Sequence, residues 1–227
     1  LIELCLTMAY DYKVNYTDVY SQVRCWDTII YNHLLTKNIQ IPPREDQVKD
    51  TQYEGAYVKD PQLGLHNWIV SFDLNSLYPH LIMQYNISPE TFVGTEPKAV
   101  GVENFLDERL NLKWAKDRNV TIAPNGAMFK RDKQGFLPEL MEKMYTERVV
   151  FKKKSIEAKK EYQKTKDPIY KNEISRCHNI QMAKKISLNS AYGAIGNQYF
   201  RYFDVKQAEA ITLGGQLSIR WVERDVN

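Results

Sequence analysis

Two short stretches of the sequence carry side chains that could bind a metal ion together with phosphate groups. Asp73 directly follows the apolar run 68–72, which is typical of a buried strand, and a carboxylate there could bind a hard divalent cation such as Mg²⁺. The next turn leads through Ser76 and Leu77 into a predicted short helix over 79–84, and the free N–H groups of a helix N-terminus favour phosphate. The alternative is that Asp73 and Ser76 only cap this helix.

The second stretch places three different functional groups on one face of a predicted helix. Lys185, Asn189 and Tyr192 are spaced i, i+4, i+7 and therefore share a face. A cation, an amide and an aromatic ring could hold a phosphate, orient a neighbour and stack on a base. Arg148 and Lys152 stand i, i+4 on an earlier predicted helix, and both cations suit a triphosphate. The same spacing also fits an ordinary basic amphipathic hairpin.

The elements that would position these residues are a mixture of helices and short strands. A long charged helix over 137–164, a turn at 165–168 and a second helix over 170–192 predict a helical hairpin. Residues 1–40 have helical spacing that ends at Pro42 and Pro43. The remaining predictions are turns at Ser88-Pro89 and Asn125-Gly126, an extended segment over 196–203, and a final helix capped by Asp204.

Composition narrows the class of protein. Of the 227 residues 43% are apolar, enough for a folded core, and no apolar run reaches the roughly 20 residues of a membrane span. Three dispersed cysteines argue against a disulfide framework or a zinc site and suggest a reduced, cytoplasmic setting. The net charge is +3, but residues 130–185 carry 16 Lys/Arg against 8 Asp/Glu, which favours a polyanionic partner or a solvated basic helix.

Both chemistry-bearing stretches resemble motifs of family B DNA polymerases. Residues 73–79 (DLNSLYP) resemble the family's D-x-x-S-L-Y-P motif, and residues 185–193 (KISLNSAYG) resemble its K-x-x-x-N-S-x-Y-G motif. Residues 53–56 (YEGA) are similar to the loop that joins the exonuclease and polymerase parts. The sequences around 86–91 and 196–202 look like the replicative polymerases of T-even-type bacteriophages, which implies action in the host cytoplasm.

The resemblance implies an α+β fold and a division of the whole chain. The fold would be a polymerase palm, an antiparallel sheet with helices, with an inserted antiparallel helical hairpin called the fingers. The implied parts are 1–40 as the C-terminal end of the exonuclease domain, 41–67 as a linker, 68–136 as the first part of the palm, 137–195 as fingers, and 196–227 as the second part of the palm, truncated before the second catalytic aspartate.

The resemblance also implies a role for each motif residue. Asp73 would be a catalytic, metal-binding aspartate, and the Leu74 carbonyl a further metal ligand. Tyr78 would lie under the sugar and exclude a 2′-hydroxyl. The other nucleotide-binding residues would be Ser76 and Leu77 through their backbone amides, the cations Arg148, Lys152 and Lys185, and Asn189 and Tyr192. The implied DNA-binding residues are Tyr53, Gly55, Ala56 and Gly193.

The implied reaction is nucleotidyl transfer from a dNTP to the 3′-hydroxyl of primer–template DNA, with two Mg²⁺ ions. The family's second catalytic aspartate lies in a D-T-D motif, which this sequence does not contain. We therefore expect the chain to be incomplete and inactive alone. It would be either part of an intact polymerase or a subunit of a split one, completed by a second chain with the D-T-D motif and the thumb. A third alternative is a non-catalytic nucleic-acid-binding module.

Overall fold

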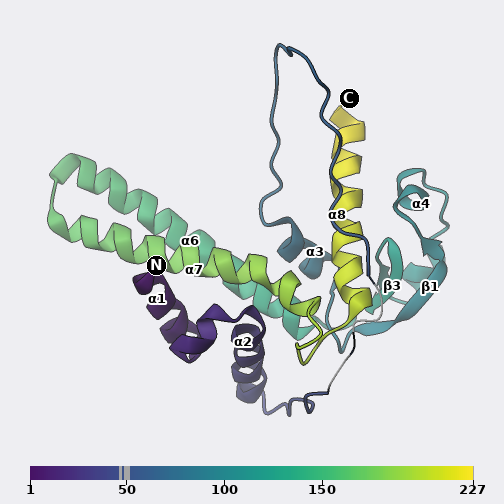
Figure 1. The fold of residues 1–227 in the computed structure, drawn as a ribbon, viewed down its shortest axis with the longest axis horizontal. Helices are drawn as coiled ribbons and strands as arrows, with labels where there is room; N and C mark the ends of the chain where they lie inside the picture. The colour runs from purple at the N-terminus through teal and green to yellow at the C-terminus, as the bar shows by residue number, and fades with distance from the viewer. Residues whose placement is uncertain (46–47, 49–51, 227) are drawn as a thin grey trace.

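Two long helices form an antiparallel pair that extends away from the rest of the molecule (Figure 1). In this computed structural model, which describes residues 1–45, 48 and 52–226, α6 spans Phe136–Thr165 and α7 spans Pro168–Ile195. Lys166 between them is left-handed (φ 60°), and the Asp167 carboxylate caps α7 by accepting a 2.9 Å hydrogen bond from the Ile169 N–H. Both helices are one to three residues longer at each end than predicted from the sequence.

A small antiparallel sheet forms the opposite end of the molecule. Its strand order is β1-β3-β2, with β1 at Phe92–Val100, β2 at Val120–Ile122 and β3 at Asn125–Lys130. Two short helices, α4 (Val102–Leu106) and α5 (Lys113–Asp117), lie in the connection from β1 to β2. The Asn125 amide donates a 2.7 Å hydrogen bond to the Lys206 carbonyl, which ties the sheet to the last helix.

The last helix packs against a short helix that begins at the end of the first motif. α8 spans Val205–Val226, and the predicted cap is confirmed, because the Asp204 carboxylate accepts hydrogen bonds from the Lys206 and Gln207 N–H groups. α3 spans Leu77–Tyr85 and so begins two residues before the predicted start at Pro79. Proline is tolerated there because the first-turn N–H groups of a helix have no intrahelical acceptor.

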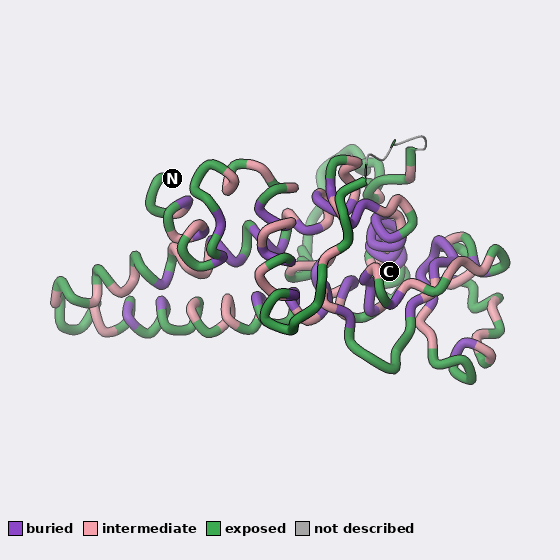
Figure 2. Tube along the Cα trace, turned by 90° about the horizontal axis from the view of Figure 1, so that it is seen from below, coloured by how far each residue is buried: buried purple, intermediate pink, exposed green. Residues whose placement is uncertain are grey.

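The N-terminal residues form α1 (Ile2–Tyr12), a short 3₁₀ helix (Tyr16–Tyr20) and α2 (Gln22–Thr36), which pack along the helix pair. Trp26 of α2 is only 1% exposed, and its indole N–H donates to the Ser187 carbonyl and the Ser190 hydroxyl of α7. Burial is concentrated where α2, α3, α8 and the inner halves of α6 and α7 meet, while the outer half of the helix pair is mostly exposed (Figure 2).

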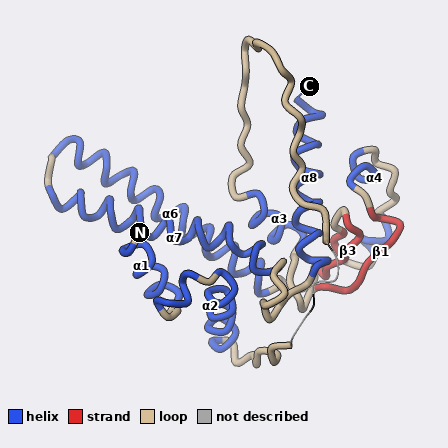
Figure 3. The backbone as a smooth tube through the Cα atoms, viewed as in Figure 1, coloured by secondary structure: helices blue, strands red, loops and turns tan. Residues whose placement is uncertain are grey.

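Two sequence predictions of extended structure are wrong. The apolar run 68–72 belongs to a long irregular segment that precedes α3 and passes close to α8 (Figure 3), and Trp68 in it is 99% exposed. β-propensity alone does not make a strand, since a strand needs a neighbour for its backbone groups, and none of the described residues supplies one here. Residues 196–203 form hydrogen-bonded turns, in which the Phe200 N–H donates to the Asn197 carbonyl at 2.9 Å.

The molecule therefore has an α+β fold with a small antiparallel sheet and a preponderance of helix. The turn predicted at Ser88-Pro89 is confirmed by a hydrogen bond from the Thr91 N–H to the Ser88 carbonyl. The turn predicted at Asn125-Gly126 is confirmed by a 2.8 Å hydrogen bond from the Gly126 N–H to the Ala123 carbonyl, and the two residues also begin β3. The predicted linker residues 46–47 and 49–51, and residue 227, lie outside the described residues. None of the described helices has the length and apolar character needed to cross a membrane.

Candidate functional site

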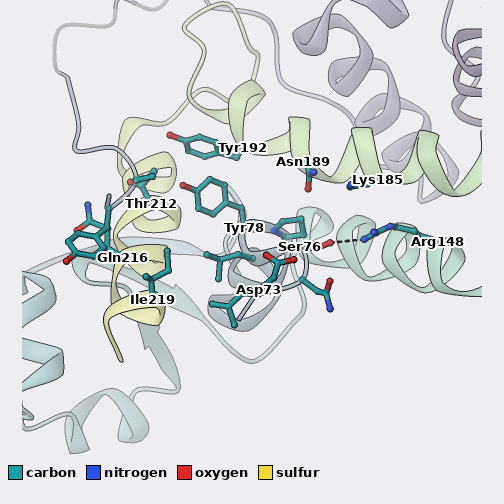
Figure 4. Close-up of a pocket in the computed structure, with 17 residues that line it drawn as sticks. Asp73, Ser76, Tyr78, Arg148, Lys185, Asn189, Tyr192, Thr212, Gln216 and Ile219 are labelled. Carbon is teal, nitrogen blue, oxygen red and sulfur yellow. Dashed lines mark hydrogen bonds between the residues drawn. The ribbon is translucent and has the colours of Figure 1, made fainter. Parts of the chain in front are cut away.

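A pocket of about 530 Å³ lies between α3, α7 and α8 and is closed on one side by α6 (Figure 4). It brings together most of the residues that the sequence singles out, although they come from four separate parts of the chain. Its lining consists of Ala56, Tyr57, Asp73, Leu74, Asn75, Ser76, Leu77, Tyr78, Pro79, Arg148, Lys185, Asn189, Tyr192, Thr212, Gly215, Gln216 and Ile219.

Asp73 lines the pocket, and its carboxylate has no partner among the described residues. The side chain is exposed, and it forms no hydrogen bond or ion pair with any residue that the structure describes. Leu74 follows it in the lining, so the Asp73 carboxylate and the Leu74 backbone are presented at the same wall. The alternative in which Asp73 serves only as a helix cap is wrong, because α3 has no side-chain cap hydrogen bond.

Ser76 connects this wall to α6. It adopts the left-handed conformation (φ 51°) immediately before α3, and its hydroxyl accepts a 2.9 Å hydrogen bond from Nη1 of Arg148 instead of capping the helix. The Arg148 Nε is buried and has no hydrogen-bond partner among the described residues. His80, one turn into α3, fixes the same corner by contacting the Ser76 carbonyl at 2.9 Å and the Tyr145 ring edge to face. Arg148 is thus held at the pocket with donor capacity to spare.

The i, i+4, i+7 set on α7 faces the pocket as its spacing predicts. Lys185, Asn189 and Tyr192 all line it, and the side chains of Lys185 and Asn189 are exposed to solvent. Figure 4 shows these residues along α7, on the opposite side of the pocket from Asp73 and Ser76. Arg148 and Lys185 therefore present two cations to a cavity whose other wall carries one free carboxylate.

Three tyrosines form a stacked and hydrogen-bonded group at the end of the pocket nearest α8. The Tyr78 and Tyr192 rings have centroids 4.8 Å apart, and the Tyr192 hydroxyl lies 3.2 Å from that of Tyr53. Burial raises the pKa of both Tyr78 and Tyr192, so both phenols stay neutral at physiological pH. Gly215 of α8 lies against the Tyr78 ring, where any side chain would reduce the space for the ring.

The sequence interpretation missed two polar residues of α8 that organise the pocket. The Thr212 hydroxyl donates to the Glu54 carbonyl at 2.9 Å, and the Gln216 amide donates to the Gly55 carbonyl at 2.8 Å. These bonds hold the irregular segment against α8, so that Ala56 reaches the lining. The available signal was the i, i+4 pairing of Thr212 and Gln216 between apolar helix positions, where a polar side chain needs a partner.

Four of the predicted residues do not line the pocket. Lys152 is exposed one turn beyond Arg148 on α6, and the Tyr53 hydroxyl contacts that of the lining residue Tyr192. Gly55 contributes its carbonyl to Gln216. Gly193 packs against α2, because a Cβ there would come within 1.9 Å of the Gln22 amide nitrogen. The Gln22 side chain, whose amide donates to the Ser190 carbonyl at 2.7 Å, thus occupies the space that a side chain at position 193 would take.

The donor set suits a divalent cation only in combination with substrate oxygens. Among the described residues there is no cluster of three His, Cys, Asp or Glu side chains that could hold a metal. Mg²⁺, however, commonly uses one or two carboxylates together with phosphates. The exposed Asp73 carboxylate fits that mode, and the cations Arg148 and Lys185 line the same cavity.

Comparison of the sequence with known proteins shows the family to which the chain belongs. The model of the family described as "DNA polymerase family B" matches residues 14–227. The chain belongs to DNA polymerase family B. It is 32% identical to the DNA-directed DNA polymerase of Escherichia phage RB69 and 31% identical to that of Enterobacteria phage T4, in both cases over 100% of this chain and 29% of the relative.

The family B relatives extend beyond phages, and the fold agrees with theirs. DNA polymerase 1 of Pyrococcus abyssi is 35% identical over 77% of this chain and 19% of that protein. The solved structure of the family B DNA polymerase from the archaeon Pyrobaculum calidifontis superposes with a TM-score of 0.69 at 22% identity, covering 98% of this chain and 26% of that one. The chain thus spans less than a third of the length of each of these relatives.

Proposed function

We propose that this chain forms the nucleotide-binding half of a DNA polymerase active site and takes part in template-directed DNA synthesis. The observation that carries the proposal is the meeting of Asp73, Tyr78, Arg148, Lys185 and Tyr192 around one cavity. The first two come from one motif and the last two from another, more than 100 residues later in the chain. A pure nucleic-acid-binding module would need the cations but neither the free carboxylate nor the tyrosine pair.

In the proposed complex the dNTP lies along the pocket from α6 to α8. Arg148 and Lys185 bind the triphosphate as charge-assisted donors, together with the backbone N–H groups of Ser76 and Leu77 at the start of α3. Tyr78 lies under the deoxyribose and excludes a 2′-hydroxyl. Tyr192 packs on the nascent base pair, and Asn189 lies on the α7 face between Tyr192 and Lys185. The YEGA segment, held by Thr212 and Gln216, touches the template strand.

The reaction forms a bond between the primer O3′ and the α-phosphorus and breaks the bond from that phosphorus to the pyrophosphate oxygen. The side chains supply positioning and charge neutralisation: Arg148 and Lys185 hold the leaving pyrophosphate oxygens, and the preorganised donors require little rearrangement as charge moves onto them. Asp73 and the Leu74 carbonyl would hold Mg²⁺, which would supply Lewis-acid stabilisation of the phosphate oxygens.

We propose that polypeptide outside this sequence completes the site. Two-metal transfer needs a second carboxylate anchor, and the D-T-D motif that provides it in the family is absent from the sequence. The exposed apolar run 68–72 next to Asp73 is consistent with a strand that pairs only when that polypeptide is present, because an unpaired apolar strand is otherwise unfavourable. The source could be the same protein or a partner chain that also carries the thumb.

On this proposal the structural parts take the names of polymerase subdomains. Residues 1–40 are the end of an exonuclease domain and 41–67 the linker. Residues 68–136 and 196–227 belong to the palm, and the helix pair within 137–195 is the fingers. The basic outer surface of α6 then carries Lys152, which would approach a triphosphate only if the helix pair moves inward.

Nucleotide binding tests the proposal directly. We expect the chain to bind a fluorescent dATP analogue in the presence of Mg²⁺, and the Arg148→Ala and Lys185→Ala variants to bind it at least tenfold more weakly, because each loses a charge-assisted contact to phosphate. Lys160→Ala, which removes an exposed cation farther out on the same helix, is the matched control and should bind almost normally. Equal binding by all four proteins would refute the assignment of the pocket.

Primer extension tests the incompleteness. We expect no extension by the chain alone and recovery of extension when a chain with the D-T-D motif and thumb is added. Robust extension by the chain alone with Mg²⁺ would contradict the need for a second carboxylate. Failure of every complementing chain to restore activity, despite normal dATP binding, would argue against a split enzyme.

A further inference from the structure

On each of the two long helices, one residue lines the pocket and the residue before it faces another side of the helix pair. On α6, Arg148 lines the pocket, whereas Glu147 lines a second cavity on the other side of the helix pair. On α7, Lys185 lines the pocket, whereas Lys184 lines that second cavity. Neighbouring positions of an α-helix are about 100° apart and are rigidly connected. A contact made by Glu147 or Lys184 therefore influences where Arg148 or Lys185 stands. Behind both helices lies α1 with its residue Asp11.

Lys184 is the buried centre of an ionic cluster that joins all three helices, while its two carboxylate partners, Asp11 and Glu147, are each 34% exposed. Its side chain is 5% exposed, and its ammonium group lies 2.6 Å from the Glu147 carboxylate and forms a second ion pair with Asp11. The same ammonium lies 4.8 Å from the centroid of the Tyr12 ring, within the range of a cation–π contact. A buried ammonium is unfavourable without such partners, so the cluster strongly favours one relative placement of α1, α6 and α7.

This placement determines where the two pocket cations stand. A rotation or slide of α6 or α7 large enough to separate Glu147 from Lys184 also moves Arg148 and Lys185, because each is the next residue on the same rigid helix. The other side-chain hydrogen bond from α1 to α7 among the described residues, from Asn179 to Glu3 at 3.2 Å, is exposed to solvent and lies farther from the pocket along α7. The cluster therefore joins α1 to the pocket-bearing part of the hairpin through a buried ammonium group.

We propose that Lys184 is a positioning residue for the triphosphate-binding cations, and that α1 acts through it on the nucleotide pocket. Lys184 itself does not touch the nucleotide; it holds Arg148 and Lys185 at the pocket by pairing with Glu147 and Asp11. The inference rests on the proposed function, since it assumes that the pocket takes a nucleoside triphosphate. It adds that the N-terminal helix, which lies outside the pocket, contributes to nucleotide affinity.

The experiment measures dATP-analogue binding with Mg²⁺ to the full 227-residue chain by fluorescence anisotropy. We expect Lys184→Met to weaken binding about tenfold, which corresponds to about 1.4 kcal/mol. Lys184→Arg should restore most of the affinity. Asp11→Asn should weaken binding in the same direction, although it changes only α1. Arg201→Met is the matched control, because it removes a part-buried ion pair to Asp27 that lies outside the cluster.

A second background separates positioning from a general loss of structure. In the Arg148→Ala/Lys185→Ala double variant, Lys184→Met should have almost no further effect on analogue affinity, because the residues through which it acts are gone. An equal loss in both backgrounds, or a loss matched by Arg201→Met, overturns the positioning role. Normal binding by both Lys184→Met and Asp11→Asn also overturns it. If the unsubstituted chain does not bind the analogue, the proposed function fails as well.

Discussion

The contact between Gly215 and Tyr78 allows a single methyl group to test how α8 shapes the pocket. A Cβ built on Gly215 lies 3.0 Å from Cε1 of Tyr78, whereas carbon atoms pack best at about 3.5–4.0 Å. The ring would have to retreat by about 0.5 Å or more. Retreat toward Tyr192 is limited, because the two ring centroids are already 4.8 Å apart. We therefore expect the Tyr78 ring to shift within the pocket and to change the space that we assign to the sugar.

Gly214 provides a matched control for this substitution. It lies one residue earlier on α8, and a Cβ there would meet Tyr85 at 3.3 Å and Leu81 at 3.5 Å, away from the pocket. Both Gly→Ala changes gain roughly 0.5–1 kcal/mol of helix stability, because alanine loses less backbone entropy than glycine. We expect this gain to offset a modest packing cost of about 1 kcal/mol at either position. Unfolding by urea should thus change by about 1 kcal/mol or less in both variants.

Nucleotide affinity should separate the two variants even though their stabilities are similar. We expect Gly215→Ala to lower the affinity for the dATP analogue about three- to tenfold, which corresponds to about 0.7–1.4 kcal/mol. Gly214→Ala should bind normally. The reasoning is refuted if both variants bind equally well, or if Gly215→Ala loses several kcal/mol of stability, since either result would mean that the ring relaxes in another direction.

Three further predictions concern the stability of the sheet, the dependence of stability on pH, and the selection of the nucleotide sugar. Gly126→Ala should lose roughly 2–4 kcal/mol in urea unfolding, because φ is +80° and the added Cβ lies 2.5 Å from the Glu96 carbonyl oxygen, whereas Gly94→Ala, in open space, should lose clearly less. Burial lowers the pKa of His33 below 6.5, so the unfolded chain binds the proton more readily. Stability should therefore fall as the pH drops through 6.5, and less so in His33→Gln; an unchanged pH profile in that variant would exclude His33 as the cause. In a complemented enzyme, Tyr78→Ala should raise the ratio of ribonucleotide to deoxyribonucleotide incorporation, and an unchanged ratio would remove the sugar-excluding role.

Helical periodicity made much of the site predictable from the sequence. Lys185, Asn189 and Tyr192 face the pocket because a helix of 3.6 residues per turn places i, i+4 and i+7 on one side, whatever it packs against. The same rule fails to separate Arg148 from Lys152, which share a face of α6 but differ in distance from the pocket. Only the packing of α6 against α3 decides that Arg148 reaches Ser76 and Lys152 remains in solvent.

The α8 residues that line the pocket could not be predicted from the sequence. Thr212 and Gln216 are hydrogen-bonded to backbone that lies more than 150 residues earlier in the chain, so no local pattern identifies their partners. From the sequence alone, Gly215 is only a residue that destabilises a helix. Its contact with the Tyr78 ring is visible only in the structure. The positions of the α8 residues at the pocket are thus determined by tertiary contacts, while the α7 residues that line it follow from local spacing.

The wrong prediction of a strand at 68–72 follows from the same distinction. Its β-branched and aromatic residues favour a strand, but this preference is realised only on a surface that covers the side chains and pairs the backbone. In the described structure neither is available, and Trp68, Ile69, Val70 and Phe72 are all exposed. Because Asp73 is the next residue, whatever pairs with this run would also fix the direction of the carboxylate. Pairing of this run and orientation of the proposed metal ligand Asp73 should therefore occur together, and the primer-extension experiment with an added chain tests both.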